Sequence, residues 1–436
     1  MDTVLIALVS GAVLVVGYLT YGRFLAKFIM RLDPRANVPS REFQDGVDYV
    51  PTRRSVLFGH HFASIAGTGP IVGPAIAAYW GWLPAIVWIV LGSIFVGAVH
   101  DLGALALSVR SKGESIGIIS GLVISPRARL LFLLVLFFLL LAFLAVLGLV
   151  IATVFAVYPE TVLSVWSAMP MAVIIGLWIQ RHPGRKIYIP SIIALVILYA
   201  AVYVGVEYLP ITLGSLPLLA PAGATGLSQF ASSVAIWTII ILIYCYFASV
   251  LPVWMLLQPR DFINALQLFV AMMFLFAGIF FSHPEMVAPA LSDHPPTDAP
   301  PILPFLFITV ACGAVSGFHS IVSTGTSSKQ IANESDALTI GYGGMLLEGA
   351  LAVLVVIACT AGIGMGLYNY GGPGVAPTPL LGADGSQVVG IDAWYQHYTG
   401  SYSGMGLKQS IGAFVVGGGN LIHSTFVPLR MATGMV

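Results

Sequence analysis

The chain contains few charged residues. Asp, Glu, Lys and Arg make up 8% of the 436 residues, whereas 58% of the residues are hydrophobic. Soluble domains carry about 25% charged residues, so this composition predicts an integral membrane protein surrounded by a lipid bilayer. The formal net charge is zero, which does not provide the strongly basic face that nucleic-acid binding requires. We therefore expect no nucleic-acid partner.

Several signatures of catalysis and cofactor binding are also missing. The three cysteines lie in apolar runs and give no disulfide pattern. No Gly-x-x-x-x-Gly-Lys-Ser/Thr loop is present, which disfavours ATP-driven pumping by this chain. A His-Glu-x-x-His helix is absent too, which disfavours a zinc-dependent hydrolase. We expect no cofactor and no enzymatic activity, and secondary transport is the function class that remains.

Long apolar runs dominate the chain. Runs of about 20 residues predict membrane-spanning helices, and no run shows the period-two alternation of an outer-membrane barrel. The first run has no basic start and no small-residue cleavage site, so we expect a retained helix. The sequence predicts an all-α polytopic membrane protein with about eleven spans, at 3–28, 57–79, 83–108, 129–157, 161–180, 187–209, 234–257, 262–281, 302–322, 342–366 and 409–430.

Basic residues fall in alternate loops between these spans. Every Lys and Arg except Lys408 lies on one side of the predicted membrane, beginning with the loop after the first span. Cytoplasmic loops carry the excess of Lys and Arg, so we expect the N-terminus outside. Arg430, after the last span, is assigned to the cytoplasmic side on this basis.

The stretch 59–74 interrupts its apolar span with glycines and prolines. Gly costs a helix interior about 1 kcal/mol and Pro about 3 kcal/mol relative to Ala. Unwound backbone survives in a membrane only where it is buried in protein or lines a cavity. We expect a substrate carboxylate to bind at free N–H groups around the break, with Gly67, Thr68, Gly69 and Pro70 as candidate residues.

Setting the first helix (1–30) aside, ten spans remain and divide into two sets of five, 55–209 and 234–436, within one transporter domain covering 1–436. Five is odd, so the second set must run in the inverted direction. The broken span 57–79 then corresponds to 234–257, where Ser249 and Pro252 mark a second break. Interrupted segments at matching places in two halves indicate a transporter's binding site.

Several ionisable side chains lie within the apolar spans. Such groups are costly at membrane depth and are functional candidates. His100 and Asp101 form either a proton relay or a structural hydrogen bond, and we weigh the two equally. Glu348 is expected to pair with a His or Lys from a neighbouring helix, or else to carry protons. The candidates for proton or ion coupling are His100, Asp101, His319, Glu348, His60 and His61, and we favour an interfacial position for the last two.

Hydroxyl side chains lie on both sides of His319 in a glycine-containing stretch. Ser316, Ser320, Ser323 and Thr324 could contribute to a sodium site, although small and hydroxyl residues are also the usual material of helix packing, which we favour. No metal site is expected, because no tight ligand spacing such as His-x-x-x-His is present.

Three blocks resemble the carbon starvation protein A (CstA) family. They run from His60 to Pro74 and on through Asp101, from Ala248 to Asp261, and from Ser316 to Glu348. The resemblance implies a bacterial inner-membrane transporter for peptides or pyruvate. It also implies a five-plus-five inverted repeat like that of the leucine transporter, within the amino acid–polyamine–cation superfamily. Family members extend beyond the position of Val436, so we expect a short member or an incomplete chain.

The function expected from these observations is proton-coupled import of peptides by alternating access. The first alternative is import of pyruvate or another small carboxylate, coupled to protons or sodium. An alternative of another class is a nutrient sensor or metal-binding membrane protein that transports nothing. Peptide and pyruvate both offer a carboxylate, so the sequence leaves the choice between them open.

Overall fold

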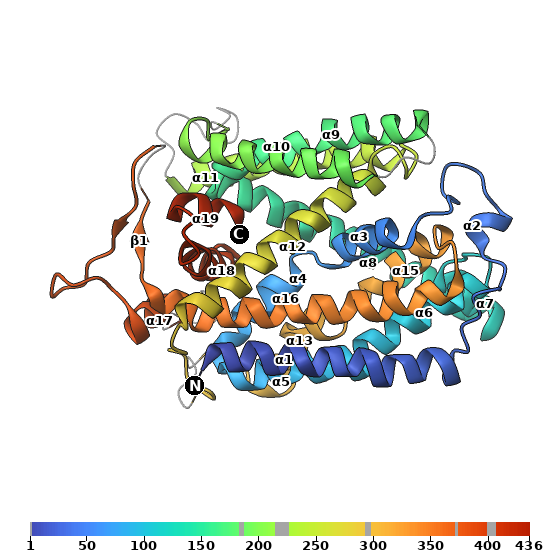
Figure 1. The fold of residues 1–436 in the computed structure, drawn as a ribbon, viewed down its shortest axis with the longest axis horizontal. Coiled ribbons are helices and arrows are strands. Elements are labelled where there is room, and N and C mark those ends of the chain that lie inside the picture. Colours follow the sequence, from blue (N-terminus) through green and yellow to red (C-terminus); the bar gives the residue numbers. More distant parts are fainter. Residues whose placement is uncertain (1, 183–186, 214–225, 293–297, 371–373, 399–406) are drawn as a thin grey trace.

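The computed structural model describes residues 2–182, 187–213, 226–292, 298–370, 374–398 and 407–436. It is mostly helical, and the long helices run roughly along the long axis of the molecule (Figure 1). Eight of the described helices are long and apolar enough to cross a membrane. This finding supports the predicted all-α polytopic membrane protein. They cover Thr3–Ile29, Trp82–Arg110, Pro126–Val157, Pro159–Arg181, Tyr188–Glu207, Phe230–Ser249, Leu257–Ser282 and Glu334–Met365.

Most of these spans are single α-helices, and three contain π-helical turns. The first span begins as α1 (Thr3–Gly17) and the second joins α5 (Trp82–Gly92) to α6 (Ala98–Arg110) through the π-helical turn Ser93–Gly97. The others are α8 (Pro126–Val157), α9 (Val162–Arg181), α10 (Tyr188–Glu207), α11 (Gly226–Ser249), α12 (Leu257–Ser282) and α16 (Gly343–Thr360), the last preceded by the π-helical turn Leu338–Tyr342.

The expected span 57–79 consists of two helices, α3 (Arg54–Ile65) and α4 (Gly69–Ala77). The α3 segment and the segment Gly69–Trp80 meet at an angle of 46°. Pro70 lies in the first turn of α4, where its missing N–H costs nothing. Counted as one span, the bent pair brings the total in the described residues to nine.

Two expected spans are shorter helices in the structure. The span 302–322 corresponds to α13 (Ile302–Thr309), α14 (Ala311–Ala314) and α15 (Phe318–Gly325). The span 409–430 corresponds to α18 (Leu407–His423) and α19 (Leu429–Met435). Counting apolar residues does not detect such interruptions, and the number eleven therefore stays a prediction.

The expected second break, at 249–252, falls at the end of a helix. Helix α11 ends at Ser249 and α12 begins at Leu257, so Pro252 belongs to a connection between two helices. Proline disfavours helical backbone at the preceding residue, which is consistent with a helix end here. The interrupted segment that packs against the α3–α4 pair is instead α13–α15: a side chain at Gly69 would collide with Cys312. The matching of 57–79 with 234–257 stays a prediction.

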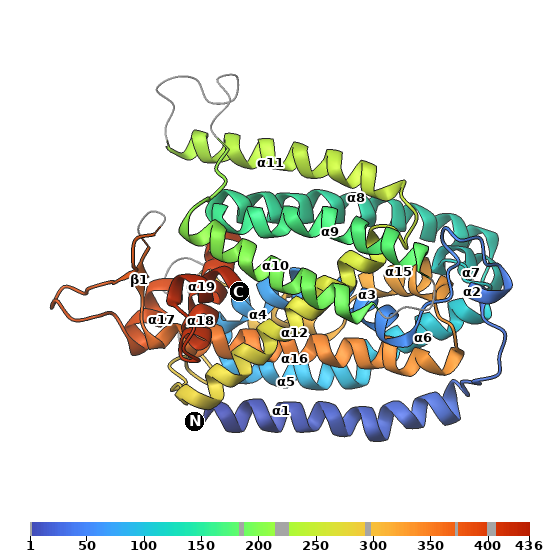
Figure 2. The same ribbon diagram turned by 45° about the horizontal axis from the view of Figure 1, so that its top comes forward.

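Helix α16 lies at the centre of the bundle. The span containing it is almost entirely buried, and it contacts α1, α3, α4, α5, α12 and α18. Helix α8 has the opposite character, because its most apolar window has no buried residue, as expected for a helix that faces lipid. Figure 2 shows α8 and α11 on the far side of the molecule from α1.

The two ends of the bundle differ. One end carries α2 (Pro39–Glu42) and α7 (Ile116–Val123); the other carries α17 (Gly390–Tyr398) and the antiparallel strands β1 (Tyr368–Asn369) and β2 (Thr378–Pro379) (Figure 1). Arg110 lies at the first end, where it pairs with Glu334. Arg430 lies at the second end and donates to the carbonyl of Val375. Its predicted position beside the other basic residues was wrong, because α18 ends at His423 and α19 does not carry the chain across.

Candidate functional site

A buried histidine lies between two buried carboxylates. His319 Nδ1 is 2.7 Å from Asp101 Oδ2, and His319 Nε2 is 3.0 Å from Glu348 Oε2. All three side chains are completely buried. They come from α15, α6 and α16, so three helices meet at this acid–histidine cluster. The sequence prediction that Glu348 pairs with a histidine agrees with this contact.

Irregular backbone surrounds each member of the acid–histidine cluster. A π-helical turn precedes α6, another precedes α16, and α15 begins directly after the break at 315–317. Such π-helical turns often occur at functional sites. Gly341, in the π-helical turn before α16, allows this turn to approach the backbone of α6, because a Cβ there would lie 3.1 Å from the carbonyl of Asp101. The close approach brings Asp101 and Glu348 to the same imidazole.

With a neutral histidine, the acid–histidine cluster has too few protons to form a hydrogen bond at each of its close contacts. A neutral imidazole has one N–H, so His319 can donate to only one of the two carboxylates. Neither oxygen of Glu348 has a hydrogen-bond partner with good geometry within the described residues. Buried carboxylates normally have such partners. An additional proton on Glu348 or on His319 would remove this deficit, and the arrangement is therefore suited to loading and releasing a proton.

His100 extends the acid–histidine cluster toward a less buried region. Its Nδ1 lies 2.9 Å from the second oxygen of Asp101, and its side chain is 37% exposed. Asp101 thus has one fully buried and one half-buried histidine partner. The structure shows a hydrogen bond here, and the choice between a relay and a structural role stays a prediction.

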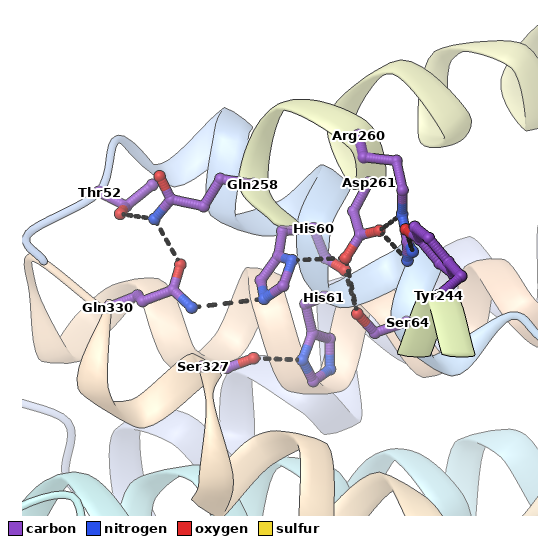
Figure 3. Close-up of polar contacts among 10 residues, drawn as sticks. All are labelled: Thr52, His60, His61, Ser64, Tyr244, Gln258, Arg260, Asp261, Ser327 and Gln330. Atoms are coloured by element: carbon purple, nitrogen blue, oxygen red, sulfur yellow. Dashed lines mark hydrogen bonds and ion pairs between the residues drawn. The ribbon is translucent and has the colours of Figure 1, made fainter. Parts of the chain in front are cut away.

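His60 and His61 are both buried within the protein, and their expected position at the membrane interface stays a prediction. The ring of His60 is part of a second network (Figure 3): its Nδ1 lies 2.8 Å from Asp261 Oδ2, and Arg260 donates to the other oxygen of Asp261. His61 Nδ1 lies 2.8 Å from the hydroxyl of Ser327. The ring of His61 also packs against Gly344, one turn before Glu348 on α16.

The amides in Figure 3 favour one tautomer of a neutral His60. Gln258 donates to Thr52 and to the amide oxygen of Gln330, whose nitrogen then faces His60 Nε2 at 3.3 Å. In this orientation Gln330 is the donor and His60 Nε2 the acceptor, so the proton of the neutral ring lies on Nδ1, toward Asp261. Sequence analysis missed Asp261 and Arg260 because it began this span at 262, after both charges.

The candidate substrate residues at the first break differ in their surroundings. Thr68 lines a cavity of about 370 Å³, and Gly67 is exposed. At the start of α4, Pro70 has no N–H, and the N–H groups of Ile71 and Val72 donate to the carbonyl of Thr68. Pro70 is buried, and Gly69 packs against Cys312, so neither of these two offers a free side-chain surface.

The structure does not bring Ser249 and Pro252 to this break. Ser249 is exposed, and its hydroxyl donates to the carbonyl of Tyr246. The segment after Pro252 lies against the loop at Val47, to whose carbonyl Val253 donates. These two residues therefore lie at the α2 end of the bundle.

The candidate sodium residues lie at and within α15. Ser320 and Thr324 donate to carbonyls of their own chain turn, and Ser316 accepts a weak bond from Cys312. The buried hydroxyl of Ser323 has no hydrogen-bond partner within the described residues. Own-helix bonds are typical of packed hydroxyls, and a sodium role stays a prediction.

One set of potential metal ligands overlaps the acid–histidine cluster. Ligand atoms of Cys312, His319 and Glu348 lie within 4.8 Å of one another. These are ligand types that zinc accepts. Both nitrogens of His319 already face carboxylates, however, so a metal would have to displace Glu348 from its present contact.

Two further cavities adjoin the bundle. A cavity of about 720 Å³ between α1, α12 and α16 has apolar walls, including Phe269 and Met272, and is unsuited to a charged substrate. A second, of about 690 Å³, lies at the α17 end and is lined by Glu160, Tyr370 and His397 among others. Burial lowers the pKa of His397 below its ordinary value.

Apolar spans that enclose carboxylates, histidines and an arginine define a multi-pass membrane protein with a polar interior. The chain belongs to the carbon starvation protein CstA family, whose model matches residues 2–371. The predicted family resemblance is thereby confirmed. No solved structure matches the chain.

Relatives in this family are named as transporters. The chain is 37% identical over 368 residues to the "Pyruvate/proton symporter BtsT" of Escherichia coli K12, covering 83% of this chain and 49% of the relative. It is 36% identical over 359 residues to the "Peptide transporter CstA" of Campylobacter jejuni, covering 81% and 49%. For the "Peptide transporter CstA" of Bacillus subtilis the identity is 33% over 365 residues, covering 83% and 58%. The chain spans about half the length of the curated relatives it matches.

Proposed function

We propose that this protein is a proton-coupled transporter that imports peptides across a bacterial inner membrane by alternating access. The observation that carries the proposal is the completely buried acid–histidine cluster of Asp101, His319 and Glu348. Ionisable groups at such depth mark proton and ion pathways. Relatives named as peptide transporters and as a pyruvate/proton symporter support the same function.

The acid–histidine cluster gives the coupling a physical basis. With both carboxylates ionised and His319 protonated, its net charge is −1, and one further proton makes it neutral. Burying a net charge costs several kcal/mol, so the proton-loaded form is the one best suited to a closed, dry site. Because α15 and α4 both begin at helix breaks, a change at His319 can be transmitted to the packing beside Gly69 through Cys312.

Pyruvate is the alternative substrate, favoured by the name of one relative. Sodium is the alternative coupling ion, for which the unpartnered hydroxyl of Ser323 is the candidate ligand. The N-terminus outside, the single transporter domain with its inverted five-helix repeats, and the inner-membrane location remain part of the proposal. The non-transporting sensor lacks a supporting observation of its own.

Uptake by the purified protein in proteoliposomes tests the proposal. Labelled dialanine and labelled pyruvate are offered separately, each with no gradient, with a proton gradient and with a sodium gradient. We expect dialanine to accumulate only with the proton gradient. If only pyruvate accumulates, pyruvate is the substrate, as in the alternative. If neither compound shows saturable uptake, transport by this chain is rejected.

A further inference from the structure

Helix α12 presents a polar stripe to a cavity in the bundle. Arg260, Asn264 and Gln267 are spaced by four and three residues and so lie on one helix face. All three line a cavity of about 410 Å³ between α8, α9, α11 and α12, whose other walls are largely apolar. Within the described residues, the side-chain amides of Asn264 and Gln267 make no hydrogen bond. The stripe therefore offers donors that the protein itself does not use.

Arg260 is held in place by hydrogen bonds that use only part of its guanidinium donors. Its Nε and Nη2 lie 2.9 and 2.7 Å from Asp261 Oδ1, and its Nη1 lies 3.3 Å from the hydroxyl of Tyr244. Guanidinium has five N–H donors, so these three bonds leave two. Its side chain is 26% exposed, toward the cavity that it lines. Asp261 is in turn fixed by His60 and Ser64, so the orientation of Arg260 is set from two helices.

This Arg260 cavity adjoins the cavity at the first helix break. Ile151, Phe155, Ser164, Val165 and Gln267 line both of them. One end of the combined space therefore has the guanidinium of Arg260, and the other has Thr68 and the start of α4. A three-carbon acid would fill a small part of cavities of about 370 and 410 Å³, whereas an extended peptide could contact both ends.

We propose that the Arg260 cavity is a binding site for the carboxylate of the transported substrate, with Arg260 as its counter-charge and Asn264 and Gln267 as further donors. This inference rests on the proposed transport function and moves the carboxylate from the first helix break to α12. Guanidinium is the side-chain group best matched to a carboxylate. The Arg260–Asp261 pair is neutral overall, so a bound carboxylate adds one negative charge. A proton carried together with the substrate would offset that charge.

A competition assay in proteoliposomes tests the site. Uptake of labelled dialanine is inhibited with unlabelled dialanine or with dialanine amide, which lacks only the carboxylate charge. For the wild-type chain we expect dialanine to bind on the order of tenfold to a hundredfold more tightly, the scale of one or two charged hydrogen bonds. The double variant R260Q/D261N replaces the neutral Arg260–Asp261 pair with two uncharged side chains. In this variant we expect the ratio of the two affinities to fall close to one.

The variants are chosen so that misfolding does not imitate the result. R260Q alone leaves Asp261 without its main partner, so the double variant is the informative one. Where it no longer transports, protection from thermal unfolding by the two compounds gives the same ratio. Arg54→Gln is the matched control, because Arg54 is 63% exposed and its contact with Asp336 is 3.7 Å long.

A retained preference for dialanine in R260Q/D261N would overturn the Arg260 site while leaving transport intact. Lack of uptake by the wild-type chain would instead reject the proposed function. If the wild type transports pyruvate and not dialanine, the same comparison is made with pyruvate and pyruvamide, and the expected ratios are unchanged.

Discussion

His319 Nδ1 lies 2.7 Å from Asp101 Oδ2, although the two residues are 218 positions apart in the chain. The contact joins α15, which follows a helix break, to α6, which follows a π-helical turn. Both groups are completely buried and ionisable. A change in the protonation of either one therefore changes the contact between α15 and α6.

Asp101→Asn should abolish the response of uptake to a proton gradient. The amide keeps the size of the side chain but cannot exchange a proton with His319. We expect gradient-driven accumulation to fall by about tenfold or more, while exchange of internal for external substrate continues. Labelled-substrate uptake with and without a pH gradient measures both. If accumulation in the variant still follows the gradient, Asp101 is not the coupling group.

His100→Gln is the matched comparison for His319→Gln. His100 is 37% exposed and contacts one oxygen of Asp101, whereas His319 is fully buried and contacts both carboxylates. Glutamine can still donate to Asp101 at position 100, but at position 319 it cannot take up a proton between the two carboxylates. We expect near-normal gradient-driven uptake for the first variant and its loss for the second. Equal effects in the same assay would contradict the assignment.

Substitutions at the first break should separate packing from binding. Gly67 has open space around its Cα, whereas a side chain at Gly69 would collide with Cys312. We expect Gly67→Ala to keep the thermal stability of the protein. Gly69→Leu should lower its free energy of unfolding by about 1–3 kcal/mol or more through overpacking. Thermal unfolding of the purified variants measures this, and a stable Gly69→Leu variant would contradict the predicted collision.

Thr68 then becomes the residue that tests binding at the break. Thr68→Val keeps the shape of the side chain and removes the hydroxyl from the cavity that it lines. We expect weaker uptake with unchanged stability. Normal uptake by this variant would leave the Arg260 cavity as the remaining candidate for the substrate.

Asp261→Asn tests the second network through stability. Removing one partner of a buried ion pair costs about 3–5 kcal/mol because it leaves the other charge unpaired. The pair of Arg54 and Asp336 is partly exposed, and such pairs contribute about 0–1 kcal/mol. Asp336→Asn is therefore the control. We expect a large fall in the midpoint of thermal unfolding for the first variant and little change for the second; similar midpoints would mean that water reaches Asp261.

The sequence predicted much of this arrangement and missed identifiable parts of it. Apolar runs predicted the eight long helices because length and composition decide whether a segment can span a membrane. A bend of 46° lies within the stretch rich in glycine and proline, and its role as the break of one span stays a prediction. Pro252, in contrast, suggested a break within a span but follows the end of α11, since a proline disfavours helix whether or not the span continues.

Contacts between distant segments were the part that the sequence could not supply. Each candidate ionisable residue was visible from its position in an apolar run, but nothing local indicates that His319 meets both Asp101 and Glu348. Asp261 was overlooked because two adjacent charged residues, Arg260 and Asp261, are typical of a loop outside a span. The folded chain instead buries Asp261 against His60. Such contacts depend on which helices pack together.

Metal analysis of the purified protein gives the last prediction. Cys312, His319 and Glu348 are close enough to share an ion, but Asp101 and Glu348 already lie against both nitrogens of His319. We therefore expect no metal in stoichiometric amount, and we expect Cys312→Ser to retain proton-driven uptake. Elemental analysis before and after treatment with a chelator, together with uptake by the variant, provides the measurement. If one equivalent of zinc is present, and chelation removes both the zinc and the uptake activity, the acid–histidine cluster binds a metal instead of a proton.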